Sequence, residues 1–378
     1  MNIRLVKLGI GLLLVLLMVG HNFVFNAPQS LQDSIMSVHQ VPITQFNLLY
    51  TLQTLPTIFL IIPLGFLYDS YGAGMLIPSA LLAVIGQVLM IIYTPLRSSF
   101  SFIMMITGRV LQGISAEILY MGQGVLATKW MGSLVGFILV LPEIGEIGNA
   151  FITPILNIHG GLYLALVVGL ILCVVSVIAS ILLYFFDKKH ERSFLAESLP
   201  TGEVASEEVN CSRVREYSSL FWVLILICAI DESIYIPFMD NANTMIQLRF
   251  GVEYSKTGVY LCIPFAAAST SEFSIVLSTI IFGLLLKRFT RRKLTLISGI
   301  IGLAAHTIIY MLPNTKEPTA LSLVMVALSF FLFGFGLGSY YSIIYPMVGL
   351  SVKKEHTGNQ ILMQELPMPL LALSKHSV

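Results

Sequence analysis

The sequence predicts an all-helical membrane protein built from two similar halves, and three observations support this. The 378 residues are 56% hydrophobic and only 11% charged, with a mean hydropathy of +0.86, which excludes an ordinary water-soluble domain. Apolar runs of roughly 20 residues, the length that crosses a bilayer core, recur along the chain. A short turn that begins with glycine and carries charge joins two such runs at Gly65–Gly74 and again at Gly283–Lys293, which indicates an internal repeat.

Ten apolar runs are long enough to span a membrane. They are Leu5–Phe25, Phe46–Tyr68, Met75–Tyr93, Phe100–Leu126, Leu134–Leu156, Leu162–Phe186, Ser219–Phe238, Thr257–Leu286, Leu294–Leu312 and Leu321–Val348. A polar stretch that is poor in aromatic residues separates the sixth run from the seventh, as in a flexible linker. We therefore predict a six-helix half over residues 1–186, a cytosolic linker over 187–218 and a second half over 219–378.

The chain ends with a segment that resembles the start of one more helix. Asn359–Leu373 has about 15 residues, including Glu365 and two prolines. The prediction is therefore 10 or 11 transmembrane helices, with the last helix or two missing from the second half. Either a truncated gene model or shortened isoform, or a real, shortened chain, accounts for this pattern.

The basic residues predict the orientation of the helices. With the N-terminus in the cytosol, fifteen lysines and arginines fall on the inner side and four fall in outer loops. This bias follows the positive-inside rule. Both charged turns then face the cytosol, and we expect Asp69, with Gly65 and Gly72, to form part of an inner gate at a helix end.

Ionisable side chains inside membrane helices are costly, so each is a candidate functional residue. Those placed within the predicted helices are His21, Arg109, Glu117, Glu143, Glu146, Asp231, Glu232, Glu272 and His306. Six carboxylates could not all stay charged beside one arginine in a low-dielectric core. Several are therefore protonated, or they line a wet cavity, or they surround a cationic ligand.

The fourth helix carries a stripe of such residues on one face. Arg109, Glu117 and Tyr120 follow one another at helical spacing, with glycines between them that let a neighbour approach. We expect Glu117 and Tyr120 to contact a ligand. For Arg109, a gating role stands beside a structural one, in which the guanidinium bonds the end of a neighbouring helix.

The fifth helix and the second half repeat this theme. Glu143 and Glu146 lie one turn apart after Pro142, a pattern that suits a moving, water-lined helix or, alternatively, a polar clamp between helices. In the second half the candidate ligand-binding residues are Asp231, Tyr235, Glu272 and Tyr341. His21 and His306 are interpreted as hydrogen-bonded structural histidines rather than proton relays.

The sequence offers no constellation that would catalyse a reaction. It has no glycine-rich phosphate loop and no metal-ligand spacing. The four cysteines, Cys173, Cys211, Cys228 and Cys262, show no paired spacing. We predict neither an enzyme, nor a cofactor or metal site, nor a nucleic-acid partner; the expected partners are a small solute and the lipid bilayer.

Several motifs resemble the major facilitator superfamily. Gly65–Gly74 is similar to its G-x-L-x-D-x-x-G loop between helices two and three. Gly108–Tyr120 resembles the fourth helix of the lysosomal dipeptide-transporter branch, Asn26–Gln32 the segment after its first helix, and Phe221–Phe238 its seventh helix. This resemblance implies a lysosomal-type exporter of dipeptides that is held with a glycosylated accessory membrane protein. It also assigns Glu117 to the amino end of the substrate.

This chain departs from the branch at informative positions. Glu143 stands where the branch has an arginine suited to a carboxylate, and Asn26 replaces an aspartate. In the second turn Lys287 and Thr290 replace the usual aspartate and glycine. These departures favour cationic or amine-bearing ligands.

The sequence therefore predicts a secondary transporter of small amine-bearing solutes, dipeptides first, that rocks two halves about a central cavity. Its membrane is lysosomal or another endomembrane, with the plasma membrane as an alternative. The other readings are a proton-coupled symporter of another solute and a transport-dead, truncated paralogue that acts as a binding or scaffold partner.

Overall fold

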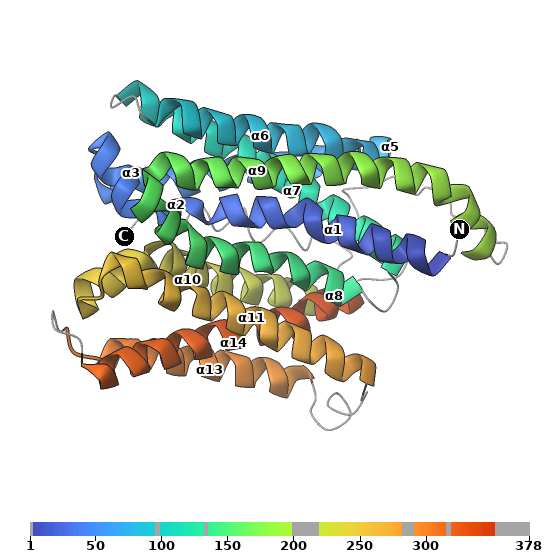
Figure 1. The fold of residues 1–378 in the computed structure, drawn as a ribbon. Helices are drawn as coiled ribbons and strands as arrows, with labels where there is room; N and C mark the ends of the chain where they lie inside the picture. The colour runs from blue at the N-terminus through green and yellow to red at the C-terminus, as the bar shows by residue number, and fades with distance from the viewer. Residues whose placement is uncertain are drawn as a thin grey trace.

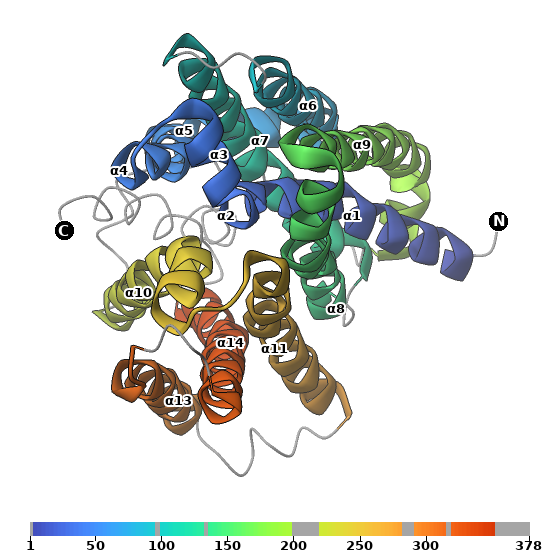
Figure 2. The same ribbon diagram turned by 60° about the vertical axis from the view of Figure 1, so that its left-hand side comes forward.

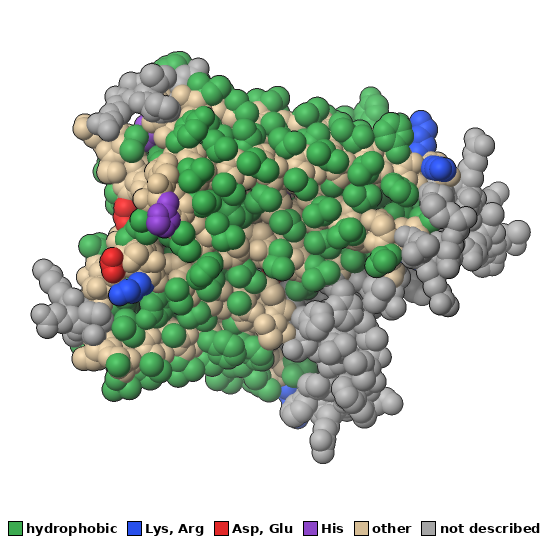
Figure 3. Space-filling model, in the orientation of Figure 1, with side chains coloured by type: hydrophobic (Ala, Val, Ile, Leu, Met, Phe, Trp, Pro, Cys, Tyr) green, Lys and Arg blue, Asp and Glu red, His purple; other side chains and the backbone are tan. Residues whose placement is uncertain are grey.

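The computed structural model is an all-helical bundle, which confirms the predicted fold class (Figure 1). It describes residues 3–94, 99–131, 135–198, 219–281, 291–314 and 319–351. Seven helical stretches of these residues are long and apolar enough to cross a membrane. Apolar side chains cover the middle of the face in Figure 3, and charged ones gather near the two ends of the bundle, as a lipid-facing surface requires.

The helices before the linker form one group in Figure 2, and those after it form a second group. The first group contains α1 (Ile3–Phe25), α2 (Ala27–Ser30), α3 (Gln32–His39), α4 (Ile43–Phe46), α5 (Leu48–Tyr71), the 3-10 turn η1 (Gly72–Met75), α6 (Leu76–Tyr93), α7 (Ser99–Met131), α8 (Val135–Val140), the 3-10 turn η3 (Leu141–Glu143) and α9 (Ile144–Ser198). The second group contains α10 (Ser219–Phe250), α11 (Tyr254–Ile281), α13 (Arg291–Met311) and α14 (Ala320–Ser351). We call these groups the first half and the second half.

The segment labelled α9 contains two membrane crossings, which are joined by a sharp turn at Gly161. Gly161 adopts φ +68° and ψ −178° inside it, a backbone conformation that favours glycine. The chain therefore reverses there, as the predicted division between Leu134–Leu156 and Leu162–Phe186 requires.

Glycines let the helices of the first half approach closely. A Cβ at Gly113 of α7 would collide with the Gln53 carbonyl of α5, and Gly86 of α6 lies against the Gly108 carbonyl of α7. The apolar core of this half is built around Leu14, Leu119 and Trp130. This packing fixes α1, α5, α6 and α7 as a unit that can carry functional side chains.

Several helix ends lie beyond the predicted boundaries, and two of them lie far beyond. α10 continues from the predicted end at Phe238 to Phe250, and α9 continues from Phe186 to Ser198, into the segment predicted as a linker. The extension of α10 contains the polar residues Asp240 and Asn243, and both are buried. Tertiary packing therefore overrode the local pattern.

Two further predictions fall outside the described residues, wholly or in part. Of the second glycine turn, Gly283–Lys293, only Arg291–Lys293 are described, as the start of α13. The final segment Asn359–Leu373 lies wholly outside the described residues.

Candidate functional site

A hydrogen bond between a glutamate of the first half and a serine of the second half links the two halves. Glu143 is the last residue of η3, in the first half, and Ser269 belongs to α11, in the second. The Ser269 hydroxyl donates to Glu143 Oε2 at 2.6 Å. The Phe265 carbonyl, 2.9 Å from the same hydroxyl, is a second acceptor, so one proton serves two alternative bonds.

Glu146 lies one turn beyond Glu143 and interacts with it electrostatically. Its carboxylate also hydrogen-bonds the Asn26 side chain, which follows the end of α1. The two acids therefore share one region, as predicted from their spacing. Two charged carboxylates so close repel each other, which a proton or a cation between them would relieve.

The predicted residues of α7 lie against α1. Tyr120 donates its hydroxyl proton to Asn22 Oδ1 at 2.8 Å, and its ring meets that of His21 edge to face at 5.5 Å. Glu117 lies one turn before Tyr120 and is partly buried. α1 thus carries Asn22, beside Tyr120, and leads into Asn26, beside Glu146.

Arg109 is completely buried and bonds the end of α1. Its guanidinium donates to the Val24 carbonyl at 3.1 Å and to the Phe25 carbonyl at 2.8 Å. It also donates to the side chains of Gln112 and Gln53. The structural alternative predicted for this residue, a bond to a neighbouring helix end, is confirmed.

The second half contributes fewer described candidates. Asp231 lies on α10 with a buried carboxylate oxygen, Oδ2, that has no hydrogen-bond partner in the described part of the chain. Tyr235, one turn later, stacks on Phe333 of α14 with ring centroids 5.1 Å apart. Glu272 and Tyr341 lie on helices α11 and α14, and their side chains are outside the described ones.

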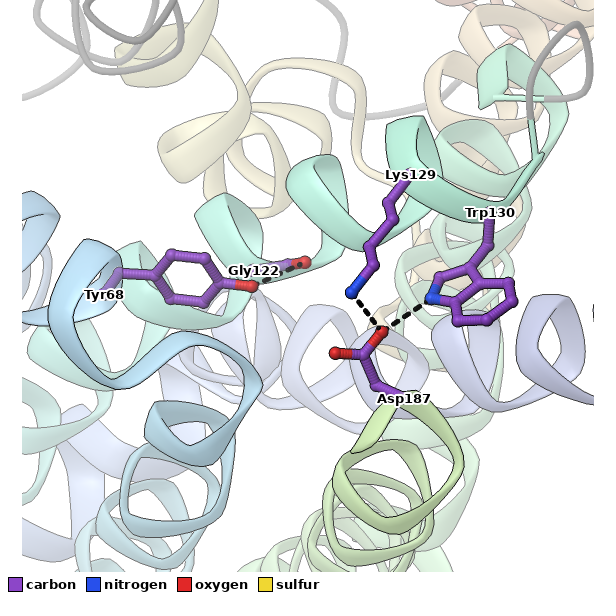
Figure 4. Close-up of polar contacts among 5 residues, drawn as sticks. All are labelled: Tyr68, Gly122, Lys129, Trp130 and Asp187. Atoms are coloured by element: carbon purple, nitrogen blue, oxygen red, sulfur yellow. Dashed lines mark hydrogen bonds and ion pairs between the residues drawn. The ribbon is translucent and has the colours of Figure 1, made fainter. Parts of the chain in front are cut away.

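The predicted gate residues lie at the first charged turn. Gly65 is buried within α5, and Gly72 ends that helix with φ +54° and donates its N–H to the Tyr68 carbonyl. The backbone of Asp69 is helical, and its side chain is outside the described ones. The Tyr68 hydroxyl lies 3.5 Å from the Gly122 carbonyl of α7 (Figure 4), which ties the turn to that helix.

Sequence reasoning missed an ion pair at the same end of the first half. Lys129 and Trp130 on α7 both point toward Asp187 on α9 (Figure 4). The Lys129 ammonium lies 2.9 Å from Asp187 Oδ1, and the Trp130 indole donates to the same oxygen at 2.7 Å. Asp187 was predicted to begin the linker, and only the length of α9 brings it to α7.

The two histidines differ from each other. His306 Nδ1 lies 3.0 Å from the Gly302 carbonyl, so the interpretation as a bonded structural histidine is confirmed there. His21 is fully buried, and in the described part of the chain neither of its ring nitrogens has a hydrogen-bond partner. For His21 that interpretation is wrong, because its neighbours Tyr120 and Phe25 present rings rather than acceptors.

The described residues hold no cluster of three metal-ligating side chains. Cys173, Cys228 and Cys262 are free thiols. The candidate site therefore consists of acids, amides and hydroxyls on α1, α7, η3, α9 and α11, which are the kinds of groups that bind polar solutes through charge and hydrogen bonds.

Comparison with known proteins identifies the family of this chain. The family model described as Major Facilitator Superfamily matches residues 8–363. The lysosomal dipeptide transporter MFSD1 of Bos taurus and that of Homo sapiens are each 26% identical over 381 residues, covering 93% of this chain and 74% of theirs.

Solved structures show the same fold at low sequence identity. A bacterial homologue of the iron transporter ferroportin, in an outward-facing state, has a TM-score of 0.67 at 14% identity and covers 98% of this chain and 91% of its own. An auto-inhibited POT family peptide transporter has a TM-score of 0.63 at 12% identity, with 98% and 89% covered. This chain belongs to the major facilitator superfamily and is a multi-pass secondary transporter, not an enzyme.

Proposed function

We propose that this transporter moves small solutes that carry a positively charged amine, with dipeptides as the first class to test. The observation that carries the proposal is the pair Glu143 and Glu146, which interact with each other beside the contact between Glu143 and Ser269 of the second half. An ammonium group placed there would offset the repulsion between two carboxylates and gain charge-assisted hydrogen bonds. Glu117 of α7 and Asp231 of α10 are further acids to test in the same assays.

The proposed mechanism is alternating access, in which the two halves rock about this region. A ligand that binds Glu143 competes for the hydrogen bond from Ser269, so binding in the first half alters a contact to the second. A ligand shifts such an equilibrium only through its different affinity for the two states. The Glu143–Ser269 bond is a contact that can supply this difference.

The lysosomal-type membrane and the dipeptide substrate rest on the named relatives, which are 26% identical. A glycosylated accessory membrane protein, expected from the resemblance, belongs to the same proposal. The acid at position 143 favours the amine end of such a substrate as the group that is recognised.

The test is uptake of a radiolabelled dipeptide, glycyl-leucine, by the purified full chain in proteoliposomes. N-acetyl-glycyl-leucine, which lacks the ammonium charge, serves as competitor. We expect Glu143→Gln to lower uptake by at least about ten-fold, because a charge-assisted hydrogen bond contributes about 1.5–3 kcal/mol, and we expect the acetylated peptide to compete poorly.

The matched control is Glu253→Gln, which removes an exposed acid paired with Lys256 at 3.6 Å and should leave uptake unchanged. Equal uptake by wild type and Glu143→Gln would refute the role of Glu143. A folded protein whose melting temperature responds to no dipeptide, amino acid or amine would instead favour the transport-dead binding partner, since a ligand of the folded state must stabilise it.

Proton coupling is a second candidate, and the closeness of Glu143 and Glu146 favours it. A proton shared by the pair would relieve the same repulsion as an amine. A symporter would accumulate its solute in response to an imposed pH gradient and lose that accumulation with a protonophore. A uniporter would equilibrate the solute in both cases.

A further inference from the structure

We propose that α2 and α3 form the outer gate of this transporter, and that Tyr254 of α11 is the positioning residue that holds the gate closed. The inference rests on the alternating access proposed above. It does not depend on which solute is carried. The outer end of the bundle is here the end that holds α2 and α3, which the positive-inside pattern places away from the cytosol.

The short helix α2 leaves carbonyl groups that need donors from elsewhere. It has four residues, and the backbone breaks at Leu31, with φ −113° and ψ 11°, before α3 begins. The last carbonyls of any helix lack partners within that helix. Both of the final carbonyls of α2, Gln29 and Ser30, are capped by side chains of the second half.

Tyr254 provides the stronger of these two caps. Its hydroxyl donates to the Ser30 carbonyl at 2.7 Å and accepts a hydrogen bond from Asn157 Nδ2 of α9 at 2.9 Å. One phenol of the second half is therefore held by two helices of the first. Burial raises the pKa of Tyr254 to about 12, so the hydroxyl keeps its donor proton at neutral and acidic pH.

α10 adds two bonds beside this contact. Asn243 Nδ2 donates to the Gln29 carbonyl at 3.4 Å, and one turn later Gln247 Nε2 donates to Asp33 Oδ2 of α3 at 2.7 Å. Gln247 also donates to Asn243 Oδ1 at 3.3 Å. These residues continue the line of contacts from the buried end of α2 to the exposed rim at Asp33.

Other bonds keep α2 and α3 with the first half. Asn157 Nδ2 donates to Ser34 Oγ of α3 at 2.7 Å, and Asn149 Nδ2 donates to Ser30 Oγ at 3.3 Å. The Asn149 amide is in turn fixed by Thr153, whose hydroxyl donates to Asn149 Oδ1 at 2.6 Å. A separation of the halves would therefore carry α2 and α3 away with α9 and break the bonds to α10 and α11.

The energetics suit a reversible gate. Groups that separate at the outer end exchange a protein hydrogen bond for one to water, so the net contribution of each bond is small. Several such bonds close the gate without locking it. Loss of both bonds of the Tyr254 hydroxyl should shift the ratio of open to closed molecules by about five-fold.

Spin-label distances in the full chain test the gate directly. The outer pair is Thr44→Cys on α4 with Ser255→Cys on α11, both exposed, and the cytosolic-end pair is Lys189→Cys with Lys293→Cys, also exposed. The native cysteines are replaced in both pairs. We expect Tyr254→Phe to enlarge the long-distance population of the outer pair by about five-fold and to shorten the distances of the other pair.

Tyr260→Phe is the matched control, because it removes a hydroxyl from the same helix at a partly buried position; it should leave both distributions as in wild type. Gln247→Ala removes the rim contact to Asp33 and the bond to Asn243 but leaves both bonds of Tyr254, so it should shift the outer pair in the same direction as Tyr254→Phe by a smaller factor. This second variant tests the gate if Tyr254→Phe does not fold.

An unchanged outer distribution in folded Tyr254→Phe would overturn the role of Tyr254. An unchanged distribution in Gln247→Ala as well would overturn the gate itself. Neither readout uses a substrate, so failure of the amine-solute proposal in uptake assays would leave this result standing, and the reverse also holds.

Discussion

The hydroxyl of Ser269 on α11 lies 2.6 Å from the Glu143 carboxylate on η3, so the second half of the protein hydrogen-bonds an acid of the first half. Glu143 follows Pro142, which is the second residue of the 3-10 turn η3 between α8 and α9. The local break in helix geometry thus places a carboxylate where it meets the other half.

Ser269→Ala should lower the stability of the protein by about 1 kcal/mol, because it removes one hydrogen bond to a partly buried carboxylate. The measurement is the melting temperature in detergent, which should fall by a few degrees. Thr270→Ala is the control, since the exposed Thr270 hydroxyl donates to its own helix at Ala266. Equal melting temperatures for Ser269→Ala and Thr270→Ala would contradict a special role for the contact.

Arg109→Met should destabilise the first half by at least about 2 kcal/mol, since two carbonyls at the end of α1 lose their donors. Arg109→Lys should recover only part of this stability, because an ammonium group cannot reproduce the planar guanidinium, whose two terminal nitrogens donate to separate carbonyls. Arg249 offers a matched control. It caps the Tyr310 and Leu312 carbonyls near the end of α13 at 3.0 and 2.8 Å, at a more exposed position.

The comparison of Arg109→Met with Arg249→Met is made by thermal unfolding. We expect the larger loss at Arg109, which is 0% exposed. If Arg109→Met unfolded at the wild-type temperature but abolished transport, a gating role would replace the structural one.

Gly113→Ala and Gly124→Ala make the same chemical change on one helix with opposite expected results. A Cβ at Gly113 would collide with the Gln53 backbone of α5, whereas nothing lies within 4 Å of a Cβ at Gly124. Gly113→Ala should therefore separate α5 from α7 and greatly reduce the yield of folded protein. Gly124→Ala should be neutral or stabilising by up to about 1 kcal/mol through helix propensity. Similar behaviour of the two variants in size-exclusion and melting experiments would argue against this packing.

His39 should make the outer end of the protein sensitive to acid. Burial lowers the pKa of His39 below its ordinary value of about 6.5, and its Nδ1 lies 3.1 Å from the Ser101 hydroxyl. The folded state therefore holds the neutral ring, and the unfolded state takes up a proton first. The stability contributed by His39 is full above about pH 6.5 and is lost as the pH falls below it.

His39→Gln should flatten the fall in melting temperature between pH 7 and pH 5. One titrating group contributes at most about 1.4 kcal/mol per pH unit. The control, His159→Gln, removes an exposed histidine of α9 and should leave the profile unchanged. A profile for His39→Gln that overlays wild type would assign the acid sensitivity to other groups.

Local sequence patterns predicted the helical architecture well, because the bilayer imposes strong length and composition requirements. The long apolar runs became α1, α5, α6, α7, α9, α10, α11, α13 and α14. The predicted turn Gly65–Gly74 is shorter in the structure, because α5 continues through Tyr71 and ends only at Gly72, whose φ of +54° favours glycine. The spacing of Glu143 and Glu146 placed them one turn apart, and they occupy the adjoining elements η3 and α9.

The partners of the polar residues could not be predicted in the same way, since a hydrogen bond across helices depends on helix rotation and on segments far apart in sequence. The seventh predicted span ended at Phe238, before the polar residues Asp240, Asn241 and Asn243, and no helix was predicted at Ala27–Ser30. The sequence by itself determined which segments enter the membrane, through hydrophobic length. Only the tertiary structure decided that α10 and α11 cap α2 through Asn243 and Tyr254, because carbonyls that one helix leaves unbonded take their donors from whichever side chains the packing brings near.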